Sequence, residues 1–300
     1  MKTKRNNTIG RHAPGAILTL VTAALLAAPT AGHADTIYVA NYHDTIQKFT
    51  PAGEGSVFAD TGLSGPAGLA FDSSGNLYVV NDNNNTIEKF TSGGVGSVFA
   101  HTGNDPQGLA IDSAGNLYVS NQSDDTIQKF TPDGVGSIFA SNGLSIPHGL
   151  AFDSTGNLYV ANGDNNTIEK FTPGGIGSVF ASTGLDLPVG LAFDSTGNLY
   201  AANFNDETIE KFTPDGVGSF FAATGWLPQG LAFDSAGNLY VANSNSGTVE
   251  KFTSEGVGSI FATVDTPTFI AIVPEPSTWT MFGLALPALL TFCRRTKEQE

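Results

Sequence analysis

The chain has 300 residues and is acidic, with 28 Asp and Glu against 13 Lys and Arg and a net charge of −15. Nucleic acid is excluded as a partner, because binding to phosphates needs the opposite sign of charge. The only cysteine, Cys293, lies near the C-terminus. The sequence before it therefore contains neither an internal disulfide nor a catalytic thiol.

Residues 1–34 have the order of parts typical of a secretory signal peptide. A basic start that includes Lys2 and Arg11 precedes an apolar run over residues 16–28, and the segment ends with Gly32-His33-Ala34. This order predicts export and cleavage after Ala34. A retained membrane anchor is the alternative, but the apolar run is short for a bilayer span.

Residues 35–273 repeat nearly the same segment about every 40 residues. In the second unit, short apolar or alternating runs predict four strands, at residues 69–71, 77–80, 86–91 and 97–100. Four strands in about 40 residues is the size of one propeller blade. One tyrosine in the second strand of each unit marks the period: Tyr38, Tyr78, Tyr118, Tyr159, Tyr200 and Tyr240.

The two ends of this repeat array complete each other. Residues 36–41 match the second strand of a unit whose first strand is missing, and residues 266–272 match a first strand with nothing after it. Pairing the last strand with the N-terminal blade closes a ring and removes two exposed strand edges. The sequence therefore predicts an all-β fold, a six-bladed β-propeller of four-stranded antiparallel blades.

Residues 274–300 follow the array and consist of three parts. They are Pro274-Glu275-Pro276, an apolar stretch over residues 279–293, and a basic end with Arg294 and Arg295. The stretch is a short membrane span whose basic end is held in the cytoplasm before processing. The tail resembles the PEP-CTERM sorting signal of Gram-negative bacteria. The resemblance implies processing by an exosortase and delivery to the cell surface, the outer envelope or an extracellular polysaccharide matrix.

Residues that recur at one position of every unit are most simply explained by the construction of the blade. We predict that the recurring Asp and Asn form turns and that the recurring Lys side chains are solvated. A calcium-binding ring is the alternative for the Asp set, and ligand binding is the alternative for the Asn and Lys sets. The sets are Asp72, Asp112, Asp153, Asp194 and Asp234; Asn41, Asn81, Asn121, Asn162, Asn203 and Asn243; and Lys48, Lys89, Lys129, Lys170, Lys211 and Lys251.

Because consecutive strands alternate in direction, the variable loops gather on one face of the predicted ring. The Asp-Ser-x-Gly-Asn hairpins after the first strands lie on the bottom face. The polar, varied loops after the second and fourth strands lie on the top face, where ligand sites on rigid scaffolds are commonly found. Residues 35–273 contain 25 Asp and Glu, six Lys and no Arg, a charge of −19 that favours solubility.

Three motifs recur in the array: Pro-x-Gly-Leu-Ala-Phe-Asp, Gly-Asn-Leu-Tyr-Val-Ala-Asn and Thr-Ile-Glu-Lys-Phe. With them the array resembles propellers with NHL repeats and is similar in motif to the gluconolactonase family, although NHL repeats usually carry Asp after Tyr-Val-Ala. The resemblance implies a divalent metal at the central channel, held in part by the x residues of Pro-x-Gly. Here the x residues include no carboxylate, so we expect no metal or other cofactor. They are Ala67, Gln107, His148, Val189, Gln229 and Thr268.

The candidate binding site lies at the channel mouth on the top face, where Gln107, His148 and Gln229 are polar x residues. Three aromatic residues of the top loops are further candidates for contact with a ligand: Trp226, Phe204 and Tyr42. The spacing assigns His148 no partner for acid–base or nucleophilic chemistry. We therefore expect an exported, non-catalytic scaffold that binds a protein or a polysaccharide. A metal-dependent, gluconolactonase-like hydrolase or lyase is the alternative, since fold does not determine function.

Overall fold

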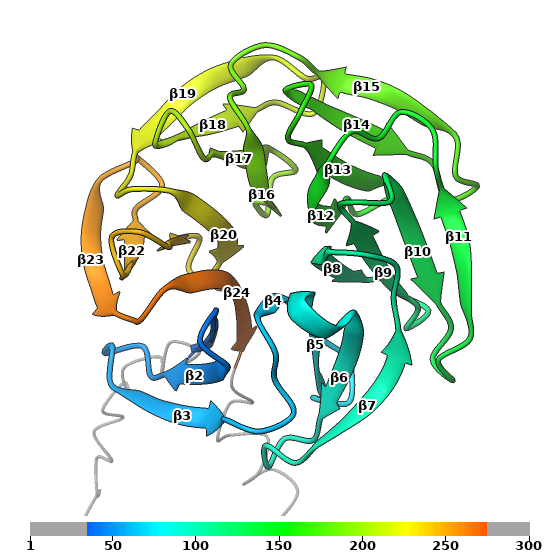
Figure 1. Ribbon diagram of the computed structural model, residues 1–300. Coiled ribbons are helices and arrows are strands. Elements are labelled where there is room, and N and C mark those ends of the chain that lie inside the picture. The colour runs from blue at the N-terminus through cyan, green and yellow to red at the C-terminus, as the bar shows by residue number, and fades with distance from the viewer. Residues whose placement is uncertain (1–34, 275–300) are drawn as a thin grey trace, which may run out of the picture. The chain divides into compact units, whose positions relative to one another are not determined.

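The repeats fold into six four-stranded antiparallel sheets, which form the blades of a ring (Figure 1). The computed structural model describes residues 35–274. The predicted signal peptide lies outside these residues, and so does the predicted sorting signal apart from Pro274. Within residues 35–274 no helix is long and apolar enough to cross a membrane. The helical element there is a single 3-10 turn, η1 (Asp82–Asn84).

Each blade has four strands, numbered here from the channel outward. The innermost strands begin with Pro: β24 (Pro267–Pro274), β4 (Pro66–Phe71), β8 (Pro106–Ile111), β12 (Pro147–Phe152), β16 (Pro188–Phe193) and β20 (Pro228–Phe233). The second strands end with Asn: β1 (Asp35–Asn41), β5 (Leu77–Asn81), β9 (Leu117–Asn121), β13 (Leu158–Asn162), β17 (Leu199–Asn203) and β21 (Leu239–Asn243).

The two outer strands of each blade are equally regular. The third strands begin with Thr and end with Phe: β2 (Thr45–Phe49), β6 (Thr86–Phe90), β10 (Thr126–Phe130), β14 (Thr167–Phe171), β18 (Thr208–Phe212) and β22 (Thr248–Phe252). The outermost strands begin with Gly: β3 (Gly55–Ala59), β7 (Gly96–His101), β11 (Gly136–Ala140), β15 (Gly177–Ala181), β19 (Gly218–Ala223) and β23 (Gly258–Thr263).

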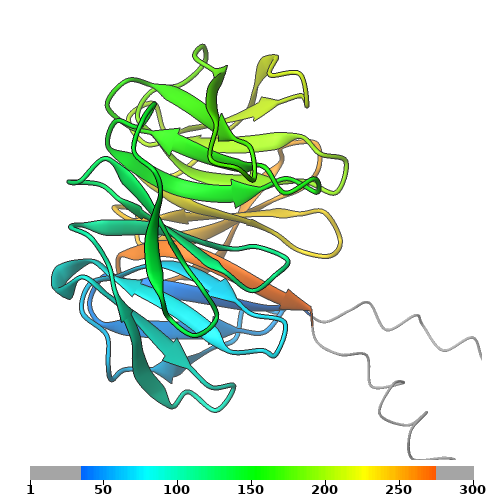
Figure 2. The same cartoon turned by 90° about the vertical axis from the view of Figure 1, so that its right-hand side faces the viewer.

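The last strand closes the ring by joining the first blade. β24 pairs with β1 in a sheet of order β24-β1-β2-β3, with Asp35 opposite Pro274 and Val39 opposite Ile270. Figure 2 shows β24 beside the N-terminal strands. The predicted fold class, the number of blades and the closure are therefore confirmed.

The core lies between neighbouring blades. The second strands have other parts of the ring packed on both faces, so their side chains point into the core on either side. In β5 all five residues are buried. Tyr78 of β5 shares one apolar cluster with Leu117 and Phe130 of the next blade. Its ring also meets the edge of Phe99 at a centroid distance of 5.1 Å, and equivalent Tyr–Phe pairs recur around the ring.

The innermost strands approach one another closely because five of them have glycine as their third residue. A Cβ atom on Gly190 would lie 1.9 Å from the carbonyl oxygen of Gln229 in the next blade. A Cβ atom on Gly149 would lie 2.2 Å from the carbonyl oxygen of Val189. Only a residue without a side chain permits this approach. Each of these glycines therefore holds the backbone of an x residue in the neighbouring blade.

We predict that Gly190→Ala lowers the free energy of unfolding by about 3 kcal/mol, because its methyl group forces two innermost strands apart. Gly174→Ala is the matched control, since a Cβ atom there comes no closer than 3.9 Å to a neighbouring atom. Denaturant unfolding of both variants measures the difference. Equal stability of the two variants would contradict the close approach.

Candidate functional site

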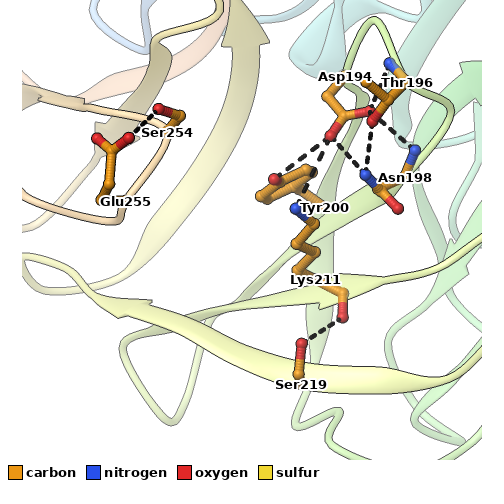
Figure 3. A network of polar contacts seen from close by, with 8 residues as sticks. All are labelled: Asp194, Thr196, Asn198, Tyr200, Lys211, Ser219, Ser254 and Glu255. Carbon is orange, nitrogen blue, oxygen red and sulfur yellow. Dashed lines mark hydrogen bonds and ion pairs between the residues drawn. The ribbon is translucent and has the colours of Figure 1, made fainter.

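The recurring Asp residues of the bottom face form turns, as Figure 3 shows for Asp194. One carboxylate oxygen accepts hydrogen bonds from the backbone N–H groups of Thr196 and Asn198, both at 2.9 Å. The other accepts from the Asn198 side chain at 2.7 Å and lies 4.0 Å from Nζ of Lys211. Because the chain itself occupies the carboxylate in this way, the turn-forming interpretation accounts for the Asp set without calcium.

The recurring lysines belong to the same bottom-face network. Nζ of Lys211 lies 5.2 Å from the ring centroid of Tyr200, and equivalent Lys–Tyr contacts occur in four other blades. The paired lysine side chains are about one-third exposed, for example 33% in Lys211. They are less solvated than the sequence predicted, because each stem packs on a tyrosine ring and each ammonium group faces a hairpin carboxylate.

Because of these hairpin carboxylates, the folding stability depends on pH in the acidic range. Burial alone raises the pKa of Asp153, but hydrogen bonds from Asn157 and Thr155 outweigh burial and lower the pKa from 3.8 to about 2. The pKa values of the other four hairpin Asp residues are also lowered, by the same kind of hydrogen bonds against the effect of burial. A lowered pKa stabilises the folded state above the unfolded pKa and loses that effect as the pH falls.

We therefore predict that the melting temperature falls steeply as the pH is lowered from about 4 to about 2, because five carboxylates lose favourable charge in the same range. Asp153→Asn should be less stable at pH 7 and should show a shallower fall below pH 4. Thermal unfolding followed by circular dichroism at a series of pH values measures both effects. A melting temperature that stays constant down to pH 2 would refute the network.

The recurring Asn residues also serve the blade. Asn162 is fully buried, and its amide donates to the Thr167 hydroxyl at 3.2 Å and to the Gly143 carbonyl at 2.9 Å. The Thr begins the third strand of the same blade, and the Gly belongs to the loop that leads into this blade from the preceding one. The Asn thus ties two top-face loops together, which favours the structural interpretation over ligand binding.

The top face contains a cavity of about 550 Å³ on one side of the channel mouth. The innermost strands β8, β12, β16 and β20 contribute their x residues, and the loops after β9, β11, β13, β15 and β17 complete the wall. The polar lining residues are Gln107, Gln122, His148, Asp164, Asn166, Asp186, Asn205 and Gln229, and the others are Ile146, Gly163, Leu187, Val189 and Phe204.

Three residues that depart from the repeat hold His148 in this cavity. Ser120 is fully buried, and its hydroxyl donates to the His148 carbonyl at 2.5 Å. Gly163 leaves room for the ring, since a Cβ atom there would lie 2.8 Å from its Cδ2. The amide nitrogen of Gln122 lies 3.2 Å from Nε2 of the imidazole.

The charge of His148 follows from its burial. Burial lowers its pKa to about 4, so the ring is neutral at pH 7. Nε2 shares a hydrogen bond with the side-chain amide of Gln122. Nδ1 is buried and has no hydrogen-bond partner among residues 35–274. Folded proteins seldom leave such a polar atom unpaired unless a water molecule or a ligand pairs with it.

The structure brings four of the six predicted binding residues together. Gln107, His148, Gln229 and Phe204 all line the cavity, whereas Trp226 and Tyr42 are not among its lining residues. Trp226 is 60% exposed on the same face. The hydroxyl of Tyr42 donates to the Asn83 side chain at 3.3 Å.

Sequence reasoning missed Ser120, Gln122 and Gly163 as partners of His148. The signal was present, because Ser120 replaces the Ala or Val that other blades carry before the Asn. Gln122 and Gly163 likewise occupy the position after that Asn, which differs in every blade.

The cavity residues do not fit the divalent metal implied by the gluconolactonase resemblance. Within residues 35–274 no group of three or more His, Asp or Glu side chains is placed to hold a metal ion. The two lining carboxylates each accept a hydrogen bond instead, Asp164 from Ser145 and Asp186 from Asn205, both at 3.0 Å. A hard cation needs several oxygen ligands that converge on one point.

The fold, the repeat and the site on the channel mouth together define a β-propeller of the NHL type. The chain matches the model of the virginiamycin B lyase family over residues 22–281, and it belongs to this family. No curated protein sequence matches it.

Solved structures with the same fold include a propeller in a nidogen/laminin complex, with a TM-score of 0.73 and 21% identity over 79% of this chain and 98% of that one. Virginiamycin B lyase from Staphylococcus aureus gives a TM-score of 0.61 and 17% identity over 75% and 80% of the two chains. A streptogramin B lyase gives 0.63 and 17% over 78% and 82%. At these identities the likeness establishes the fold alone.

Proposed function

We propose that the protein is an exported, non-catalytic binding scaffold that holds a protein or a polysaccharide in its top-face cavity. One observation carries the proposal: residues that break the repeat converge on a single cavity. In a ring of near-identical blades, a residue shared by all blades builds the blade, whereas a site for one ligand must differ between blades. Gln122, His148 and Gly163 differ from their equivalents and depend on one another.

The chemistry of the cavity suits a ligand with polar and apolar groups. Gln107, Gln122 and Gln229 supply amides that both donate and accept hydrogen bonds. Leu187 and Phe204 supply apolar surface in the same cavity. A concave, largely apolar site with a few fixed polar groups is the usual form of a binding pocket.

The family match favours one second candidate, a lyase. His148 is neutral at pH 7, as a proton acceptor must be, but its Nε2 is already paired with the Gln122 amide. Proton abstraction in a lyase needs a base within hydrogen-bond reach of the substrate, and metal assistance needs converging oxygen ligands. The contacts of His148 support positioning of a ligand better than they support proton transfer.

Binding by the full chain to extracellular matrix material from the cells that produce it tests the two candidates. We predict that Gln229→Ala weakens retention of the matrix component about tenfold, because the variant loses a hydrogen bond between the Gln229 amide and the bound ligand. Val257→Ala is the matched control, since Val257 is exposed in the loop between β22 and β23 on the opposite face, and it should bind as the wild type does.

The same preparations are assayed for turnover of a sugar lactone and of virginiamycin B, with and without added Mg²⁺, Ca²⁺ or Mn²⁺. Turnover that disappears in His148→Ala would establish the lyase or hydrolase and overturn the binding scaffold. Equal retention of wild type and Gln229→Ala would show that the matrix component does not bind in the cavity.

Export and sorting form the second half of the proposal. The order of a basic start, an apolar run and Ala34 supports secretion, and Pro274-Glu275-Pro276 with Arg294 and Arg295 supports handling by an exosortase-type enzyme. The proposed location is the cell surface, the outer envelope or the matrix of a Gram-negative bacterium, with transient membrane insertion through the C-terminal segment.

We predict that replacing Pro274-Glu275-Pro276 by three alanines changes the mass or the location of the mature protein and leaves its melting temperature within about 2 °C. The reason is that only Pro274 belongs to the folded ring, at the end of β24. Mass spectrometry and cell fractionation provide the readout. Unchanged mass and unchanged fractionation would refute the sorting role.

A further inference from the structure

Two residues of the cavity wall have a backbone conformation that their side chains disfavour. Ile146 and Leu187 each precede the Pro that begins an innermost strand, and both have φ of 49°. This left-handed conformation is costly for bulky side chains and above all for β-branched ones. The conformation recurs at the equivalent position of the other four blades, where the residues are Gly65, Asp105, Leu227 and Thr266, and of these only glycine adopts it freely.

The surrounding chain enforces this conformation from both sides. The N–H group of Ile146 donates to the Asp125 side chain at 2.7 Å, and its carbonyl accepts from the N–H of Gly163 at 3.0 Å. The corresponding partners of Leu187 are Asn166 at 2.7 Å and Phe204 at 3.1 Å. The strain is therefore built into the loop, and a glycine would remove it without loss of these bonds.

The retained side chains give the cavity an aliphatic wall. Ile146 and Leu187 line it together with Val189 and Phe204, and Ile146 remains 38% exposed although it is apolar. Branched aliphatic side chains suit an apolar side chain of a ligand, whereas a sugar ring is better matched by a flat aromatic surface. The amides of Gln107 and Gln229, which line the same cavity, match the N–H and C=O groups of a peptide.

The charge around the cavity determines which residues of the ligand can flank such an apolar side chain. Asp164 and Asp186 line the cavity itself, and the loops of the top face contain neither Lys nor Arg. Every Lys of residues 35–274 lies in a third strand, in the row that faces the bottom hairpins. The acidic residues of the top-face loops are Asp44, Asp60, Asp82, Asp105, Asp124, Asp125, Asp164, Asp186, Asp206, Glu207 and Asp265.

We propose that the cavity binds a peptide segment of a partner protein that carries an apolar side chain flanked by basic residues, with Ile146 and Leu187 as the residues that select the apolar side chain. This inference rests on the proposed binding function and names the class of its ligand. The aliphatic wall receives the side chain, the glutamines bind the peptide groups, and the acidic loops attract the flanking Lys or Arg.

Four synthetic nonapeptides, titrated by calorimetry against the full chain, test the ligand class. They carry a central Leu with Lys on both sides, a central Gly with Lys, a central Leu with Glu, and a central Leu with Ser. The Leu–Lys peptide should bind most tightly, by about tenfold over the Gly–Lys peptide. Its affinity should fall as salt is added, and the Leu–Glu peptide should not bind.

The variants Ile146→Asn and Leu227→Asn test the role of the aliphatic wall. Leu227 has the same left-handed conformation before Pro, with φ of 57°, but is not among the residues that line the cavity. Because Asn tolerates this conformation, both variants should melt at or above the wild-type temperature. Ile146→Asn should weaken binding of the Leu–Lys peptide about tenfold or more, and Leu227→Asn should change it by less than about twofold.

Each outcome decides for or against the inference. Equal binding by wild type and Ile146→Asn overturns it, and Leu187→Asn repeats the test if Ile146→Asn does not fold. Binding of neutral matrix polysaccharide without binding of any peptide overturns the peptide inference and leaves the binding scaffold in place. Absence of binding to peptides, to polysaccharide and to matrix proteins overturns both proposals.

Discussion

The close approach of the innermost strands is the constraint on which the whole ring depends. Five glycines bring the backbone of one blade against the carbonyl group of an x residue in the next, at a separation that excludes any side chain. The backbone of each x residue is therefore fixed by its neighbour, whereas its side chain is free to vary. The Thr268 hydroxyl is buried, and its one proton is shared between the carbonyl oxygens of Pro66 at 2.9 Å and Ala40 at 3.2 Å. Gln107, His148 and Gln229 use that freedom to line the cavity.

The arrangement also explains why the site is off-centre. In a ring of equal blades the channel itself is symmetric, and a distinct site arises only where several neighbours change together. Here the changes fall in the blades around His148. Ser120 replaces an apolar residue and holds the His148 carbonyl, and Gly163 replaces a larger residue and makes room for the ring. A single substitution at one of these positions would leave a clash or an unpaired polar group.

The sequence predicted the fold and four residues that line the candidate cavity because both follow from comparison between repeats. The spacing of the tyrosines gave the blades, the split unit gave the pairing of β24 with β1, and the variable x residues led to the cavity. The left-handed residues before Pro were not predictable, since a residue before Pro normally avoids that conformation. It recurs in all six blades, and at Ile146 and Leu187 hydrogen bonds of the folded loops hold it. Trp226 and Tyr42 were candidates because they are aromatic residues in polar top-face loops, but they are not among the residues that line the cavity.

The pairing of Asp35 with Pro274 has a consequence for how the ring is presented. These residues lie at the bottom end of their strands, since Asn41 at the other end of β1 meets Thr45 across the top loop. Both limits of the folded ring thus lie on the side opposite the cavity. A tether attached to either end turns the cavity outward, away from the surface that carries the tether. The lysines near the bottom and the unbalanced acids on the top also give the two faces unequal charge, with the cavity on the more negative one.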